Sequence, residues 1–458
     1  MTQMSRSIRM TRAGRRIGLA AVVVTAATLA LSGCASAASD RPVELTYWMW
    51  DANQMDGYQQ CLDAFEDANP TVGVHLEQVG WNDYWTKLTT GLVAETAPDV
   101  FVNHPQQFGT YADLDQLLPL DDLVGPAGPV DLADYQPGLA DMWVGQDGHR
   151  YGLPKDWSAI GLFYNADQLA DAGVDPATLE DLDWNPRDGG SYERLIAHLT
   201  VDDNGVRGDE AGFDRAHVKV YGLGLNRNNN GGFGETQWSF LALADGWSYA
   251  DRNPWGTRFS YDDERFLETV TWWRGLIDKG YMPTFTVASS GMNDTDAFAA
   301  GRYAMITQGS WNARAIASAG GFPVGIAPTP IGPTGSRATV TTALGDSVWA
   351  GTKHPEEAKR LVAFLATPEC QDLVAKQARV FPALRGSSEL AAAAFADQGV
   401  DVSAFTVQQQ EGTAVPSPVV LGWTRLQEIM GPTMDAFLAG ADPDTFEKAN
   451  RQVDAIFR

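Results

Sequence analysis

The sequence has little positive charge for its length. Its 458 residues include 33 Lys and Arg against 58 Asp and Glu, which leaves a formal net charge of -25 at pH 7. Nucleic-acid binders need a basic surface to neutralise phosphates, so this composition argues against DNA or RNA binding. With 44% hydrophobic and 20% charged residues, the composition is that of a globular protein long enough for two or three domains.

Histidine is also scarce, and its distribution argues against a metal site. The six histidines lack the H-x-x-x-H and C-x-x-C spacings that place ligands on one face, so no zinc site and no cofactor are predicted. The loop from Asp202 to Asp214 is rich in acids and glycine but lacks the calcium-loop spacing and its terminal Glu. We interpret this loop as a solvated insertion, with calcium binding as the alternative.

The apolar run from Leu19 to Leu31 is too short to span a bilayer, which takes roughly 20 helical residues. It follows five arginines and no acid, and it leads into Leu31-Ser32-Gly33-Cys34, which resembles a bacterial lipobox. We therefore expect a signal peptide over 1–33, a lipid on Cys34 and a tether over 34–40. The resemblance implies a protein held at the outer face of the cytoplasmic membrane by its lipid anchor alone. An ordinary secreted protein is the alternative.

Export would leave two cysteines, Cys61 and Cys370, in an oxidising compartment. Such a compartment favours a disulfide. Two cysteines so far apart in sequence could equally be buried as small hydrophobic side chains. The residues alone leave both possibilities open.

Hydrophobic periodicity predicts an α/β fold. Strands are expected at 43–50, 72–79 and 98–102, with helices at 56–69 and from 81 between them. This alternation predicts a mostly parallel sheet, in which ligands collect outside the carboxyl ends of the strands. A second α/β unit follows, with strands at 159–164 and 347–350 and helices at 191–199, 236–243, 266–279 and 354–365. The segment from 412 to 458 is expected to be mostly helical.

Several phrases, in order along the chain, carry a resemblance to a known family. They are Trp81-Asn82-Asp83-Tyr84-Trp85, Ala97-Pro98-Asp99-Val100-Phe101, Gly152-Leu153-Pro154-Lys155-Asp156-Trp157, Leu162-Phe163-Tyr164-Asn165, Phe298-Ala299-Ala300-Gly301-Arg302, Gly309-Ser310-Trp311 and His354-Pro355-Glu356-Glu357-Ala358. Together they resemble the extracellular solute-binding proteins of bacterial ABC importers, in the carbohydrate-binding family called family 1. The resemblance covers roughly residues 44–382.

This resemblance implies a two-lobed periplasmic-binding-protein-like fold with a hinge and a ligand cleft between the lobes. Lobe one would take 40–151 plus 345–382, and lobe two 152–344 plus 383–458. Cys61 and Cys370 would then share a lobe, which favours their disulfide. The implied protein is a monomer that binds a sugar, closes around it and delivers it to permease subunits, without catalysis.

A sugar site needs aromatic plates and planar hydrogen-bonding side chains. The side chains expected to supply them are Trp50, Asp51, Trp81, Asn82 and Asn103 in lobe one, and Lys155, Asp156, Trp157, Trp238 and Trp311 across the cleft. The several tryptophans suggest a disaccharide or oligosaccharide. Asp346, Phe381 and Trp423 are weaker candidates.

Each candidate has a structural alternative. Trp48 and Trp85 lie within elements and are expected in the core, Asp83 at a helix start, and Asp99 in a structural turn. Many members of the family carry Asp-Thr where this chain has Ser158-Ala159, so its specificity is expected to differ. Receptors for a polyamine or a peptide, with the same fold, are the nearest functional alternatives. A secreted glycosidase is less favoured, because no Glu stands at the expected strand ends.

Overall fold

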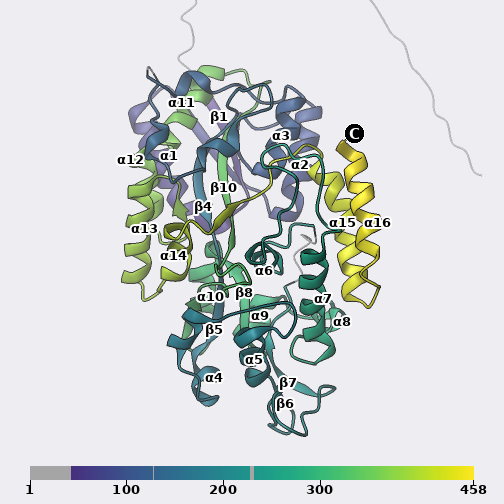
Figure 1. The fold of residues 1–458 in the computed structure, drawn as a ribbon. Helices are drawn as coiled ribbons and strands as arrows, with labels where there is room; N and C mark the ends of the chain where they lie inside the picture. The colour runs from purple at the N-terminus through teal and green to yellow at the C-terminus, as the bar shows by residue number, and fades with distance from the viewer. Residues whose placement is uncertain (1–42, 127, 227–231, 458) are drawn as a thin grey trace, which may run out of the picture. The chain divides into compact units, whose positions relative to one another are not determined.

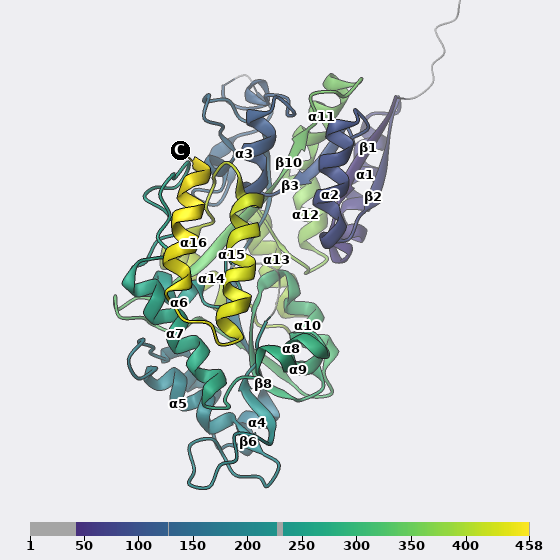
Figure 2. The same cartoon turned by 90° about the vertical axis from the view of Figure 1, so that its right-hand side faces the viewer.

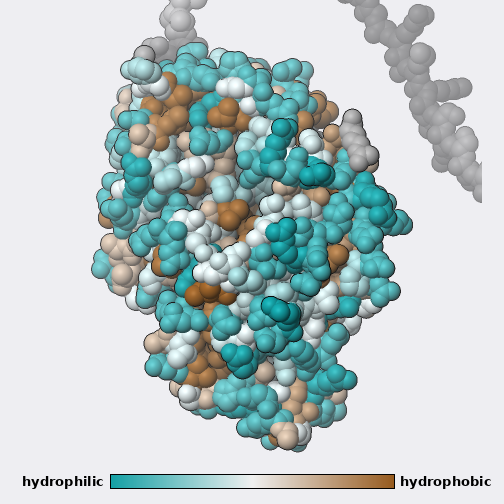
Figure 3. All heavy atoms as spheres, in the orientation of Figure 1, coloured by the Kyte–Doolittle hydropathy of each residue, from teal (hydrophilic) through white to brown (hydrophobic). Residues whose placement is uncertain are grey.

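The computed structural model describes residues 43–126, 128–226 and 232–457 (Figure 1). The expected signal peptide at 1–33, Cys34 and the tether at 34–40 lie outside these described residues. Within them, no helix is both long enough and apolar enough to cross a membrane. The face drawn in Figure 3 is mainly hydrophilic, with scattered apolar side chains, as the acidic composition predicts.

A mixed sheet organises the first part of the fold, which we call the first lobe. The described residues form seven strands in this sheet, in the order β11-β4-β10-β3-β1-β2, with β12 paired to β10. Their bounds are β1 Val43–Met49, β2 Val72–Gln78, β3 Val100–Asn103, β4 Leu153–Ser158, β10 Thr339–Val348, β11 Phe381–Pro382 and β12 Ala414–Pro416. Strand β1 runs parallel to β2 and to β3, as the sequence predicts.

The prediction of a mostly parallel sheet was wrong, because β10 runs antiparallel to both β3 and β4. The reason is the path of the chain. Strand β4 leaves this sheet for the next one at Ala159, and β10 returns from it, so the two strands point in opposite directions. Both are central to the sheet, and neither direction can be predicted from local periodicity.

A second sheet organises the part that we call the second lobe. Its order is β6-β7-β8-β5-β9, with β5 Ile160–Asn165, β6 Val201–Asp202, β7 Val218–Leu223, β8 Tyr303–Gly309 and β9 Val324–Ala327. Strand β5 is antiparallel to β8 and β9. Helix α5 (Gly190–Leu199) packs on β7, and α9 (Asp294–Ala299) packs on β8.

Helices cover both sheets (Figures 1 and 2). In α1 (Met55–Ala68), Tyr58, Cys61, Leu62 and Phe65 recur every three or four residues and are buried. The other α-helices of the described residues are α2 Trp81–Val93, α3 Pro105–Asp113, α4 Ala166–Asp171, α6 Ser239–Ala244, α7 Glu264–Asp278, α8 Phe285–Ser290, α10 Ala313–Ala319, α11 Pro355–Leu365, α12 Pro368–Ala375, α13 Arg385–Asp397, α14 Ser403–Gln410, α15 Trp423–Leu438 and α16 Thr445–Asp454. Helices α15 and α16 lie side by side, which agrees with the expected helical segment after 412.

Helices α1 and α12 pack together, and a disulfide between Cys61 and Cys370 joins them across a sequence separation of 309 residues. Both cysteines are fully buried. The bond is therefore shielded from solvent and ties α1 to α12, a helix that follows the second sheet in the chain.

The hydrogen bonds place the lobe boundary differently from the expected position at 152. Strand β4 begins at Leu153 but belongs to the first sheet, and the crossover is at Ala159. Helix α13, expected in lobe two, packs on α12 and on β11 of the first sheet. Helices α15 and α16 contribute to the apolar core of the second lobe.

Candidate functional site

Aromatic side chains cluster at the carboxyl end of β1 and the start of α2. The Trp50 ring lies edge-on to Trp81, with centroids 5.2 Å apart, and 5.3 Å from Trp85. Trp81 is 47% exposed although it is a large apolar side chain. Its neighbour Asn82 is also exposed. The first lobe therefore presents a supported indole face to solvent where the sequence predicted a sugar plate.

A buried polar network begins at Asp51, the residue after Trp50. The side-chain amide of Gln54 donates to Asp51 Oδ2 at 3.0 Å and to Asp156 Oδ2 at 3.3 Å, and its Oε1 accepts from Lys155 Nζ at 2.9 Å. Lys155 also forms an ion pair with Asp156 at 3.5 Å. The network thus joins the loop after β1 to strand β4, which leads to the crossover.

Burial controls the electrostatics of this network. It raises the pKa of Asp156, against the lowering effect of Lys155. It also raises the pKa of Asp346 to about 6, although Lys155 and a 2.7 Å hydrogen bond from Tyr47 oppose the shift. The Lys155 ammonium lies 4.1 Å from the centroid of the Tyr58 ring. One lysine therefore faces two buried carboxyl groups, and the network is acidic on balance.

Three other predicted site residues fill the core of this structure. Asn103 is buried and donates to Ser347 Oγ at 3.2 Å, while its own oxygen accepts from the next backbone N–H. Trp157 stacks on Phe381 at 4.8 Å and donates to Ser388 Oγ. Trp238 is fully buried in the aromatic cluster of the second lobe. All three have packing or hydrogen-bonding duties that the sequence did not reveal.

Trp311 follows β8 and is partly buried. It packs against two clusters of buried apolar side chains, one of which contains residues of both lobes. Of the tryptophans predicted for the far side of the cleft, it is the one that retains solvent-accessible surface.

Two further candidate residues, Gln106 and Glu235, were not predicted from the sequence. Gln106, in the first turn of α3, is buried and its Nε2 has no hydrogen-bond partner. Beside it, burial lowers the pKa of His104 to about 3, so this ring is neutral. Glu235, in the loop before α6, is also buried, and burial raises its pKa to about 7. Gln106 follows the carboxyl end of β3, a position that could have indicated it; nothing in the local sequence marks Glu235.

The α/β fold with two sheets agrees with comparisons to known proteins. A family model described as bacterial extracellular solute-binding protein matches residues 60–399. The chain belongs to this family. It is 23% identical to a putative binding protein of Brucella abortus over 94% of this chain and 97% of that protein. It is 24% identical to a galactooligosaccharide-binding protein of Bacillus subtilis over 80% of each chain.

The fold also matches solved structures. An ABC substrate-binding protein of Listeria monocytogenes, solved in complex with cycloalternan, superposes with a TM-score of 0.76. The match covers 91% of this chain and 99% of that one at 21% identity. The expectation of a two-lobed binding-protein fold is confirmed.

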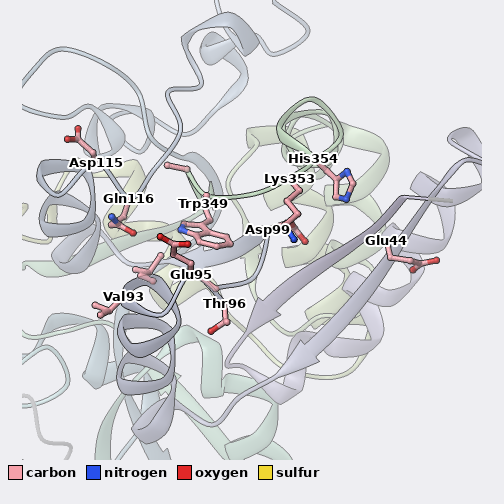
Figure 4. A pocket seen from close by; sticks show the side chains of 14 residues that line it. Glu44, Val93, Glu95, Thr96, Asp99, Asp115, Gln116, Trp349, Lys353 and His354 are labelled. Atoms are coloured by element: carbon pink, nitrogen blue, oxygen red, sulfur yellow. The ribbon is translucent and has the colours of Figure 1, made fainter. Parts of the chain in front are cut away.

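A cavity of about 730 Å³ in this solute-binding protein lies away from the predicted site (Figure 4). It is at the amino ends of β1 and β3, and Glu44, Glu95, Asp99, Trp349 and Lys353 are among its lining residues. Asp99 has a structural role, because its carboxylate accepts hydrogen bonds from Thr46 N, Thr46 Oγ1 and Thr352 Oγ1. The structural interpretation of Asp99 is confirmed.

The acidic loop of the solute-binding protein uses its carboxylates for turns. Asp202 accepts backbone hydrogen bonds from Asn204, Val206 and Asp214, at 2.8 to 2.9 Å. Among the described residues, no group of three or more His, Cys, Asp or Glu is placed to hold a metal ion.

Proposed function

We propose that this solute-binding protein captures a disaccharide or oligosaccharide in a cleft between its lobes and delivers it to the permease of an ABC importer. The observation that carries the proposal is the exposed indole of Trp81, supported by Trp50, whose next residue, Asp51, belongs to the Asp51–Gln54–Asp156 network. Indole faces bind the apolar faces of sugar rings, and planar amides and carboxylates bind their hydroxyl groups. The galactooligosaccharide-binding relative supports the same ligand class.

The site of this proposal comprises Trp50, Asp51, Trp81, Asn82 and Trp311 as direct contacts. Lys155 and Asp156 orient the first-lobe loop from beneath. Sugar bound between the lobes would contact both and so favour the closed form, which is how a receptor signals that it is loaded. The family comprises binding proteins, so the sugar would be released chemically unchanged.

The protein would act outside the cell, anchored by a lipid on Cys34 and monomeric. Metabolic labelling with a fatty-acid analogue tests the anchor: wild-type protein would be labelled and Cys34→Ala would not. Light scattering of the purified protein tests the monomer.

A thermal-shift screen tests the ligand class. The panel contains mono-, di- and oligosaccharides, a polyamine and short peptides. A ligand at 100 times its Kd stabilises the folded protein by about 2.7 kcal/mol. Stabilisation by a sugar that is recovered intact supports the proposal. Stabilisation by the polyamine or a peptide alone would replace the ligand class, and recovery of a cleaved sugar would show an enzyme.

A further inference from the structure

Glu235 lies where the second lobe meets the central strand of the first sheet. Its Oε1 accepts a hydrogen bond from Thr342 Oγ1 at 3.0 Å. Thr342 stands on β10 opposite Ser158, the last residue of β4, and the chain crosses between the sheets at Ala159. The Glu235–Thr342 contact therefore joins the lobes beside the crossover, where ligand closure would hinge.

No counter-ion faces the Glu235 carboxyl group within the part of the chain that the structure describes. Among the described residues, no Lys, Arg or His pairs with it, and the bond from Thr342 is the one hydrogen bond that its side chain accepts. Burial raises the pKa of Glu235 to about 7, and the Thr342 hydroxyl opposes that shift. The titratable group set against it is Tyr249, whose hydroxyl donates to Phe233 O at 2.6 Å. Nothing in the described protein therefore compensates a negative charge on Glu235.

The same loop carries a second acceptor with unused capacity. Gln237 is buried, and its Nε2 donates to Asn226 O at 2.7 Å. Its Oε1 is buried without a hydrogen-bond partner. A buried acceptor without a donor is costly unless another molecule supplies one. Gln237 Oε1 thus needs a donor, an ionised Glu235 can accept one more hydrogen bond, and a ligand rich in hydroxyl groups can supply both donors.

We propose that the Glu235–Gln237 loop is a second wall of the ligand site, in which ionised Glu235 accepts hydrogen bonds from ligand hydroxyl groups and capture releases a proton to solvent. Thr342 holds one carboxylate oxygen and leaves the other for the ligand. This inference rests on the proposed function and identifies the second-lobe residues that accept hydrogen bonds from the ligand. It also replaces Trp238, which the resemblance suggested and which the structure buries in the core.

The expected size of the effect follows from the ionised fraction of Glu235. If the ligand binds the ionised form, affinity rises about tenfold between pH 6 and pH 8, because that fraction rises from about one tenth to nine tenths. At pH 7, about half a proton leaves for each ligand bound.

Calorimetric titration at pH 6, 7 and 8, in two buffers of different ionisation enthalpy, measures both quantities. The probes are lactose, mannobiose, diacetylchitobiose and cycloalternan, and the one that stabilises the wild type most is titrated. Glu235→Gln keeps a side-chain oxygen that can accept the hydrogen bond from Thr342, but it removes the carboxyl group that titrates. Asp294→Asn is the matched control, because Asp294 is another buried carboxyl group of the second lobe, held by Gln308 Nε2 at 2.7 Å.

We expect the wild type and Asp294→Asn to gain affinity with pH and to release a proton. Glu235→Gln should bind about tenfold more weakly at pH 8, without pH dependence or proton release. If the wild type binds a probe but Glu235→Gln keeps the same affinity, slope and proton release, the inference is wrong and the proposed function stands. If no probe binds the wild type, both fall.

Discussion

Gln54 accepts a hydrogen bond from Lys155, 101 positions later in the chain, with 2.9 Å between Oε1 and Nζ. The opposite end of the same amide donates to Asp51 and Asp156. The neutral side chain of Gln54 therefore holds three charged side chains, those of Asp51, Lys155 and Asp156, close to one another. It also ties the loop after β1 to the strand that leads to the crossover.

Replacing Gln54 should destabilise the protein. Gln54→Leu leaves the buried Lys155 and Asp156 without their shared amide, and such losses cost about 2 to 4 kcal/mol. Urea unfolding measures the free energy. The control is Gln59→Leu, which removes only an exposed bond to Asp63 and should cost less than about 0.5 kcal/mol. Equal losses of unfolding free energy in the two variants would show that the buried network stabilises the protein no more than the exposed hydrogen bond does.

Trp81 and Trp238 should respond in opposite ways to substitution by alanine. Trp81 is 47% exposed, so Trp81→Ala should leave the melting temperature nearly unchanged and cost about 1 to 3 kcal/mol of sugar binding. Trp238→Ala removes a buried ring from an aromatic cluster and should cost about 3 to 5 kcal/mol of folding stability. Thermal unfolding and calorimetric titration distinguish them. Unchanged affinity in Trp81→Ala would remove that residue from the site.

The ligand-free protein should lose stability as the pH rises through 7. The folded-state pKa of Glu235 is about 7, above its ordinary value of 4.5, so the folded protein keeps a proton that the unfolded chain loses. This contribution is complete below pH 4.5 and disappears as the pH passes 7, with a size of about 3 kcal/mol. Urea unfolding from pH 4.5 to 8 should show a smaller decline in Glu235→Gln. Parallel curves for the two proteins would contradict the assigned burial.

The disulfide between Cys61 and Cys370 should stabilise the folded state by restricting the unfolded chain. We expect Cys61→Ser/Cys370→Ser to lose about 2 to 5 kcal/mol, measured by urea unfolding without reductant. Thiol titration of the denatured wild type should detect neither cysteine until a reductant is added. Two reactive thiols in unreduced protein would show that the bond is absent.

Local patterns in the sequence predicted most elements of the first lobe. The strand expected at 43–50 is β1 Val43–Met49, and the helix expected at 56–69 is α1 Met55–Ala68. Their side-chain periods are set by the backbone geometry of strand and helix, so a single sequence reveals them. Only the end of β10 was predicted, as the strand at 347–350. Its threonines show no apolar alternation, and they lie in a strand because β4 and β12 pair with them.

For the site, the sequence by itself determined which loops follow the strands, and so placed Trp50, Asp51 and Trp81 at one edge. Only the tertiary structure decided that Trp157 and Trp238 belong to the core, that Gln54 links three charged side chains, and that Gln106 Nε2 and Glu235 are buried without a full set of partners. Burial and hydrogen-bond partnership come from segments a hundred or more residues away, such as Thr342 for Glu235. These long-range contacts leave no periodic pattern in the sequence, and they decide whether a polar or aromatic side chain is structural or available to a ligand.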